Sequence, residues 1–373
     1  MRVWIRIFAG TLLAMGTLSM VSLRAQVPAD TLTRARPPLL RDKTIVPLPV
    51  VFRLPETGFG AGAVVAGAFS FAKDSLWAKP SQLSLGVTYT QNRQILVFLP
   101  FSIFLKNNRY YLFSDTGWYR YNYFYYGIGE ARVPQEYFDV TYPRVRLLAA
   151  RQLGPKTYAG LRYQYESYRV TRTDAGGELA SGRVVGSSFS RTSSLGPSLL
   201  RDTRDTVFYP RTGMFGELYV LPTARLLGAD RNFVRLYLDV ANYLALSPRW
   251  VLATNYVVST VMGREVPFSQ LSFLGGQKKM RGIYEGFFRD KNALLGQAEL
   301  RWELGWRLGL VGFGAVGFLG DQAEVLRLAR PKFTYGGGLR LKVQKKNHLN
   351  VRADYGLSPY GGGQLYLTLG EAF

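Results

Sequence analysis

The stretch Phe333-Thr-Tyr-Gly-Gly-Gly-Leu-Arg-Leu-Lys-Val343 decides the fold of this chain. Apolar side chains fall on one side of it, at Phe333, Tyr335, Leu339, Leu341 and Val343. Polar side chains fall on the other side, at Lys332, Thr334, Arg340 and Lys342. Successive side chains of a β strand point to opposite faces, so this period of two predicts a strand with one apolar and one charged face. A transmembrane barrel needs such strands, because lipid meets its outer face and water its interior.

The same alternation recurs along the chain between turn residues, for example in residues 231–246 and 349–355. A soluble β sandwich can show this alternation too, so the pattern by itself leaves that alternative open. The alternating runs predict an all-β protein, a transmembrane antiparallel β-barrel of about 16 strands, at ~10 residues per strand plus connections.

The composition narrows the class of protein. The 373 residues include 47 Lys and Arg against 25 Asp and Glu, one His and no Cys. Without cysteine there is no thiolate metal site or cysteine nucleophile, and one histidine leaves little for acid–base catalysis. We therefore expect no enzyme activity, no metal and no cofactor. The net charge of +22 accompanies no nucleic-acid-binding motif, so we expect lipopolysaccharide phosphates and an electropositive lumen, not nucleic acid, to explain it.

The amino terminus predicts export. Arg2 and Arg6 precede an apolar run of about 14 residues, which is the arrangement of a secretory signal peptide. A membrane anchor helix is the alternative, but the run is shorter than the ~20 residues that a helical span needs. We expect a cleaved signal peptide at 1–25, a short Pro/Arg-rich periplasmic tail at 26–43 and the barrel at 44–373 of a bacterial outer-membrane protein.

Connections between the expected strands alternate short with long. Short ones fall at 154–156, 247–249, 305–307 and 344–348, and long ones at 122–139, 173–186 and 262–292. With an even strand number and both ends in the periplasm, the long set is extracellular. The aromatic run from Trp118 to Tyr126 is expected at a bilayer interface, where such rings collect. The end of the chain resembles the terminal signal of outer-membrane barrels, with one face formed by Leu365, Leu367, Leu369 and Phe373.

The longest connection contains Leu274-Gly-Gly-Gln-Lys-Lys-Met-Arg-Gly-Ile-Tyr-Glu-Gly-Phe-Phe-Arg-Asp290, and Gln297-Ala-Glu-Leu-Arg-Trp302 follows it. A long loop that folds back into a charged lumen needs an anchor. Arginine can make bidentate contacts to an inward carboxylate, and glycine lets two backbones approach closely. Arg281 and Gly282 supply these two properties.

In this loop the sequence resembles the bacterial surface antigen superfamily, which includes BamA, TamA and the two-partner secretion transporters. Their sixth extracellular loop folds into the lumen and holds a Gly-Gly pair, then Arg-Gly followed by an aromatic residue. The matching residues here are Gly275, Gly276, Arg281, Gly282 and Tyr284. The resemblance reaches the first hairpin at 47–60 and the last strand, and it implies a loop lock in which Arg281 pairs with Glu299 on the twelfth strand.

Two positions depart from the family pattern. Ile283 follows Gly282, which displaces the aromatic Tyr284 by one residue. Ala315 stands in the thirteenth strand where the family usually has an aspartate, so the lock is expected to have one carboxylate fewer. The expected organisation also lacks POTRA domains, as in a short member of the superfamily. Whether Arg281 only pins the loop or also serves translocation stays open from the sequence.

The resemblance implies a barrel that aids outer-membrane protein insertion or translocation together with a separate partner, such as a periplasmic accessory protein. Pro47, Pro49 and Pro55 remove backbone donors from the first strand, so its seam with the last strand should be short. The alternative is a porin-like passive pore for small anionic solutes, lined by inward cations. These are Arg144, Arg146, Arg162, Arg235, Arg340 and Arg352. A structural or adhesive surface barrel is a third alternative.

Overall fold

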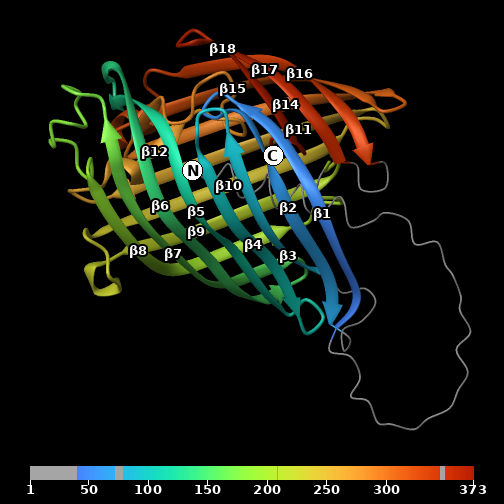
Figure 1. The fold of residues 1–373 in the computed structure, drawn as a ribbon. Coiled ribbons are helices and arrows are strands. Elements are labelled where there is room, and N and C mark those ends of the chain that lie inside the picture. The colour runs from blue at the N-terminus through green and yellow to red at the C-terminus, as the bar shows by residue number, and fades with distance from the viewer. Residues whose placement is uncertain (1–39, 72–78, 208, 345–348) are drawn as a thin grey trace, which may run out of the picture.

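A computed structural model describes residues 40–71, 79–207, 209–344 and 349–373. Sixteen antiparallel strands of this described part close into one barrel, in which each strand pairs with the preceding and the following barrel strand (Figure 1). The expected fold is therefore confirmed. The expected signal peptide and most of the expected tail lie outside the described residues.

The first eight barrel strands are β1 (Leu40–Leu54), β2 (Gly58–Phe71), β3 (Ser81–Thr90), β4 (Ile95–Leu105), β5 (Tyr110–Ile128), β6 (Ala131–Gly154), β7 (Thr157–Thr173) and β8 (Phe189–Asp202). The second eight are β9 (Gly213–Thr223), β10 (Phe233–Ala245), β11 (Trp250–Met262), β14 (Asn292–Gly305), β15 (Leu308–Gly320), β16 (Lys332–Gln344), β17 (Leu349–Ser358) and β18 (Gly362–Leu369). The connections contain β12 (Ser272–Leu274), β13 (Phe288–Asp290), η1 (Arg225–Leu227), η2 (Phe268–Gln270) and α2 (Gln322–Leu326). None of the described helices is long and apolar enough to cross a membrane.

The two faces of the strands follow the alternation of the sequence. In β16, Phe333, Tyr335 and Leu339 are more than half exposed on the outside of the barrel, whereas Thr334 and Arg340 are buried in its interior. A chain that turns its large apolar side chains outward and its charges inward requires an apolar surrounding. This arrangement excludes the soluble sandwich, which would bury its apolar faces.

One expected loop is a pair of strands. Residues 122–139 were expected as a long connection, but β5 and β6 pair as far as Ile128 with Ala131, and two residues join them. The connections at 174–188 and 263–291 are long, as expected. They leave the same end of the barrel, which we call the loop end. We call the opposite end the turn end.

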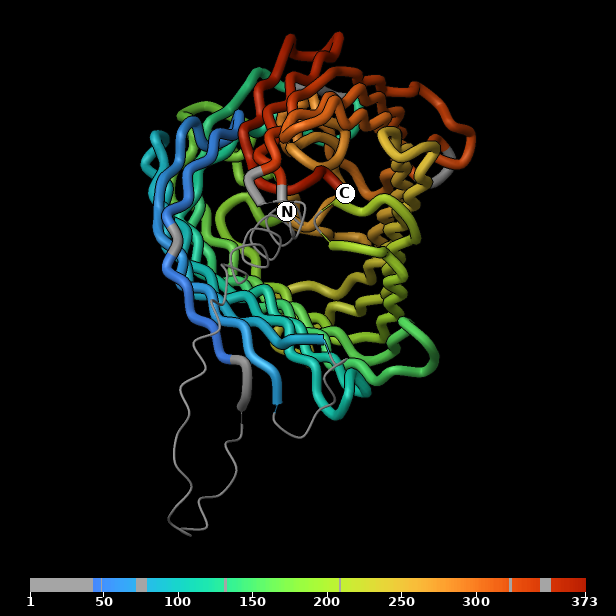
Figure 2. Tube along the Cα trace, turned by 90° about the vertical axis from the view of Figure 1, so that its right-hand side faces the viewer, coloured from blue at the N-terminus to red at the C-terminus, as the bar shows by residue number. Residues whose placement is uncertain are grey.

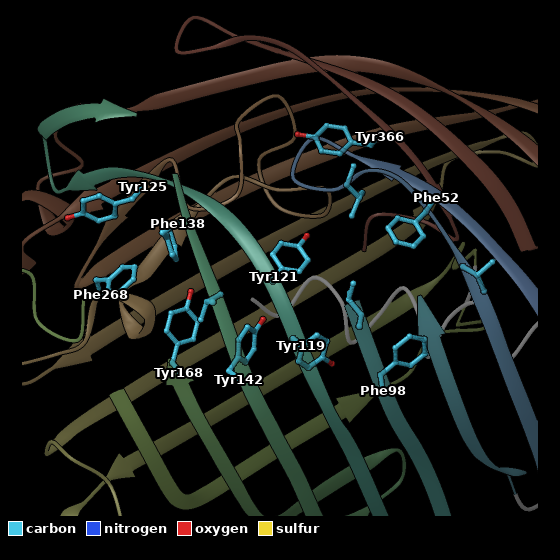
Figure 3. Close-up of a cluster of buried hydrophobic side chains, with 14 of the residues drawn as sticks. Phe52, Phe98, Tyr119, Tyr121, Tyr125, Phe138, Tyr142, Tyr168, Phe268 and Tyr366 are labelled. Atoms are coloured by element: carbon cyan, nitrogen blue, oxygen red, sulfur yellow. The ribbon is translucent and has the colours of Figure 1, made fainter. Parts of the chain in front are cut away.

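The aromatic rings of β5 also differ from the expectation. Tyr119, Tyr121 and Tyr125 do not lie at a bilayer interface but are buried in the lumen, at 0–3% exposure (Figure 3). They pack with Phe138 on β6 and with Phe268 from the connection after β11. The reason is the length of β5 and β6, whose extended ends form a wall against which this connection docks.

The seam between β1 and β18 is short. Only Arg53 and Leu367 are paired across it, whereas β1 and β2 pair from Leu40 to Leu54. The prediction of a short seam, made from the prolines of the first strand, is confirmed.

Candidate functional site

The connection of residues 263–291, which we call loop 6, lies inside the barrel. Figure 2 shows it in orange within the ring of strands, beside the red strands at the end of the chain. It starts at the end of the eleventh barrel strand, β11, and leads into the twelfth, β14. Its β12 and β13 pair with each other and not with the barrel. The loop therefore forms a small folded unit of its own, and both side-chain and backbone contacts hold it to the rest of the protein.

Arg281 fixes the tip of loop 6 to two strands. One arm of its guanidinium group contacts Glu299 on β14, and the other contacts Asp354 on β17. The guanidinium carbon also lies 3.6 Å from the ring centroid of Phe313 on β15. Arg281 is 2% exposed, and both carboxylates are fully buried. Loss of one partner from such a buried ion pair strongly destabilises the protein, because it leaves an unpaired charge away from water.

Both carboxylates belong to a larger buried charge network. Glu299 also binds Arg301 of the same strand, at 2.9 Å. Asp354 also binds Arg340 of β16, which in turn binds Glu371 at 2.7 Å. A continuous series of buried ion pairs thus runs from loop 6 to the segment that follows β18.

Glycines permit the close approach of the loop to the wall. Gly282 has φ +105°, and a Cβ added to it would lie 2.8 Å from the carbonyl oxygen of Leu357. Gly275 and Gly276 also have positive φ, and a Cβ on Gly275 would lie 2.3 Å from the carbonyl oxygen of Tyr284. A larger residue at 282 would push the loop away from β17, and one at 275 would disturb the fold of the loop itself, because each side chain would meet backbone.

Backbone hydrogen bonds join the loop tip to the last two strands. The Gly282 N–H donates to the Tyr366 hydroxyl on β18 at 3.0 Å, and Ser358 Oγ donates to the Gly282 carbonyl at 2.9 Å. The loop therefore touches the strand that forms one side of the seam.

The displaced aromatic, Tyr284, enters the aromatic wall at the end of β5. Its ring centroid lies 5.7 Å from that of Phe124 and 5.9 Å from that of Tyr126. The next residue, Glu285, donates its backbone N–H to Glu56 Oε1 at 3.2 Å. Glu56 lies in the turn between β1 and β2, where burial and the neighbouring Glu285 carboxylate raise its pKa to about 8. Loop 6 thus contacts both sides of the seam.

The end of the chain differs from the expected terminal signal. Leu365, Leu367 and Leu369 face outward from β18, but Phe373 does not share their face. Gly370, with φ +77°, ends the strand, and the chain turns into the lumen. There the backbone oxygen of Phe373 accepts a hydrogen bond from Arg301 Nη2 at 3.0 Å, and the Phe373 ring packs on β10 and β11.

Five of the six inward arginines are buried and bind carboxylates, whereas Arg235 is partly exposed and binds Ser259 and the Gln270 carbonyl. Arg144 and Arg146 both contact Asp115, and Arg162 contacts Glu217. A lumenal cavity of about 80 Å³ lies below loop 6, between β7, β10 and β11. Its size suits a few water molecules.

Asp354 is the residue of this site that the sequence did not identify. Ala315 was expected to leave the lock with one carboxylate fewer, but Asp354 of β17 supplies the second one. The alternation of β17 already indicated an inward Asp354. Its proximity to Arg281 depends on how the loop lies across four strands, which no local pattern encodes.

Comparison with known proteins agrees with this architecture. The model of the Omp85 superfamily domain matches residues 59–373. BamA from Haemophilus ducreyi, solved without POTRA domains 1–3, is similar with a TM-score of 0.58 and 14% identity over 88% of this chain and 70% of that one. CdiB from Acinetobacter baumannii (TM-score 0.54, 11% identity) and CdiB from Escherichia coli (0.56, 12%) each match over 89% of this chain.

The chain spans 60% and 62% of the two CdiB chains. None of the proteins with curated descriptions matches the sequence. At these identities the solved structures establish the fold, while the matched domain covers more than four fifths of the chain. The chain therefore belongs to the Omp85 superfamily, and its barrel fold implies a place in the bacterial outer membrane.

Proposed function

We propose that this chain aids the insertion or translocation of outer-membrane proteins by opening the seam between β1 and β18. The observation that carries the proposal is the single paired position of that seam, Arg53 with Leu367. The adjacent strands β17 and β18 pair at eight positions, from Val351 with Leu369 to Ser358 with Gly362. The seam is the boundary of the barrel with the fewest backbone hydrogen bonds to break.

An open seam would offer a strand edge to a client. Backbone N–H and C=O groups along an unpaired edge can pair with another strand, and such edge addition gives affinity without a specific sequence. β1 pairs with β2 at thirteen positions from Leu40 to Leu54, but with β18 only at Arg53. A strand of a client outer-membrane protein could therefore add to β1 while the rest of the barrel stays closed.

Loop 6 is suited to control this opening. It binds Glu299 and Asp354 through Arg281, and it contacts Glu56 on one side of the seam and Tyr366 on the other. We infer that the docked loop holds the two sides in register and that its release favours opening. Gly275, Gly276, Gly282 and Tyr284 serve this docking. A separate periplasmic accessory protein would deliver the client.

A disulfide across the seam tests the proposal, because the chain has no native cysteine. Arg53→Cys with Leu367→Cys places two cysteines at directly paired, outward positions, where Cα separations suit a disulfide. A matched control, Leu339→Cys with Ala353→Cys, links β16 to β17 at an equivalent outward pair. Each variant is placed in liposomes, and folding of an added outer-membrane protein is followed by protease protection.

We expect the oxidised seam variant to lose insertion activity and to recover it on reduction. The oxidised control variant should stay active in both states. Full activity with the seam closed by its disulfide would refute the proposal.

A passive pore for small anions is the weaker candidate. Most of the inward arginines that would select anions are already matched by carboxylates, such as Asp115 and Glu217. Loop 6 also occupies the lumen. Single-channel recordings should show little steady conductance for the unmodified chain, whereas a large, anion-selective current would favour the pore.

A further inference from the structure

An outward patch of arginines lies on the barrel wall near the loop end. Arg120 on β5, Arg169 on β7 and Arg191 on β8 are exposed on the outer face. Arg120 pairs with Thr141, Thr141 with Arg169, and Arg169 with Phe189. The three arginines therefore lie within one narrow band across β5–β8. We call Arg120, Arg169 and Arg191 the outer arginine patch.

The height of the patch follows from the other outward residues of β7. Toward the loop end the strand presents Leu161, then Tyr163 and Tyr165, then Ser167 and finally Arg169. Leucine suits the hydrocarbon core, and tyrosine suits the membrane interface. The arginines thus begin just above the tyrosines, at the level of lipid headgroups.

Two of the guanidinium groups are held together by one ring. The Arg169 guanidinium carbon lies 5.5 Å from the ring centroid of Phe189, and that of Arg191 lies 5.7 Å from the same centroid. The described residues record no ion pair for either side chain. The Asp230 carboxylate accepts the backbone N–H of Arg191 at 2.8 Å. Two like charges on a shared ring repel each other unless an anion lies between them.

The outer face of β10 and β11, which follow β9 in the barrel wall, has no such cations. On β11 the outward residues toward the loop end are Tyr256, Val258, Thr260 and Met262, and on β10 they are Leu238, Leu236 and Val234. The outward positive charge of β5, β7 and β8 at headgroup level thus does not continue onto β10 and β11.

We propose that the outer arginine patch binds the phosphate groups of lipid A, the phosphorylated glycolipid anchor of lipopolysaccharide in the outer leaflet. Guanidinium groups bind phosphate oxygens in pairs of parallel hydrogen bonds, and Phe189 between Arg169 and Arg191 packs against the lipid. The inference rests on the location of the barrel in the outer membrane and not on the seam. Binding here anchors the wall formed by β5–β8 to the outer leaflet.

The test measures binding of bisphosphorylated lipid A to the purified full chain in detergent micelles, with fluorescent lipid A as the probe. The variant is Arg169→Gln with Arg191→Gln. The matched control is Arg201→Gln, an exposed arginine at the turn end of β8. Lipid A stripped of its phosphates and phosphatidylglycerol are the comparison ligands. Heat-resistant migration on gels reports whether each barrel is folded.

We expect the double variant to bind lipid A about 10-fold or more weakly, the loss for about two charge-assisted hydrogen bonds, and the control to bind normally. Dephosphorylated lipid A should bind weakly to every variant. Equal binding by the double variant, equal loss in Arg201→Gln, or equal affinity for phosphatidylglycerol would each overturn the proposal. If the double variant fails to fold, Arg169→Lys with Arg191→Lys replaces it, and undiminished lipid A binding by that variant would count against paired guanidinium recognition. Insertion activity is measured separately, so its loss or retention does not bear on this site.

Discussion

Gly282 of loop 6 and Gly356 of β17 bring two backbones into direct contact. A Cβ on Gly356 would lie 2.6 Å from the backbone nitrogen of Gly282, with no flexible side chain between them. This contact places the loop tip against the strand that carries Asp354. It can be tested at Gly356, whose φ is ordinary, so that a substitution there acts through space alone.

Gly356→Ala should weaken loop docking. The added methyl group meets backbone, and overpacking of this kind costs roughly 1–3 kcal/mol. The measurement is the rate at which a maleimide modifies Ile283→Cys, because Ile283 is buried at the loop tip. Gly312→Ala on β15 is the control, since a Cβ there has no neighbour within 4 Å. Equal rates in the two alanine variants would show that the glycine contact is not required.

Asp354→Asn should release loop 6 about as much as Glu299→Gln. Each change removes one of the two carboxylates that hold Arg281, and hydrogen bonds to charged groups contribute about 1.5–3 kcal/mol. The rate at which the maleimide modifies Ile283→Cys should rise in both variants. When either change is combined with Arg281→Lys, the two losses of docking free energy should not add. Glu303→Gln, a half-exposed carboxylate near the turn end of β14, is the control. An unchanged maleimide rate in Asp354→Asn would contradict the role of Asp354 and support a lock with a single carboxylate.

Loop docking should also weaken as pH rises. Burial and the Glu285 carboxylate raise the pKa of Glu56 to about 8, so Glu56 keeps a proton while loop 6 is docked and releases it above its ordinary pKa when the loop is free. The other titratable groups that face Glu56 are Tyr284 on the loop, Tyr121 and Tyr126 on β5 and Tyr366 on β18. The free energy of docking is thus independent of pH below about pH 4.5. Between about pH 4.5 and about pH 8 it becomes less favourable as the pH rises, by at most about 1.4 kcal/mol per pH unit.

Glu56→Gln should remove this dependence. Its maleimide rate, corrected by an exposed Leu226→Cys reference for the reactivity of the thiol itself, should stay level between pH 5 and 8. In the protein that keeps Glu56, the maleimide rate should rise between pH 5 and 8. A parallel rise in both proteins would mean that Glu56 does not govern the docking.

Much of the fold was predictable because its signal is local. The alternation of residues 333–343 predicts which side chains face lipid. The glycines and Arg281 of the long connection indicate a loop that is anchored in the lumen. Glu299 could be named because it lies on the polar face of the strand that follows the loop. The contacts that sequence reasoning missed join segments far apart in the chain.

The rings of β5 show where a local signal is ambiguous. Tyrosine suits both a membrane interface and a buried aromatic cluster, and its position depends on whether a partner such as Phe268 is present in the lumen. The inward turn of Phe373 is a similar case. Its outward placement followed from the period of two, but Gly370 ends that period and Arg301 binds the carbonyl of Phe373.

The buried charge network predicts that the loop and the segment after β18 respond together. Arg340 bridges Asp354, which holds the loop, and Glu371, which holds that segment. Arg340→Met should therefore raise the modification rate of Ile283→Cys although Arg340 does not touch the loop, because Asp354 loses one of its cationic partners. The expected loss is about 1–3 kcal/mol, or roughly five- to a hundredfold in rate.

Arg162→Met provides the matched control, since Arg162 is an equally buried arginine whose carboxylate partner, Glu217, lies on β9. It should change the stability of the barrel without changing the rate at Ile283→Cys. A cysteine at Ala372 should become reactive in Arg340→Met as well, because Glu371 keeps only its hydrogen bond from Asn350. Release of loop 6 without the segment after β18, or the reverse, would mean that the ion pairs act independently. Two separate restraints would then act on the seam instead of one coupled restraint.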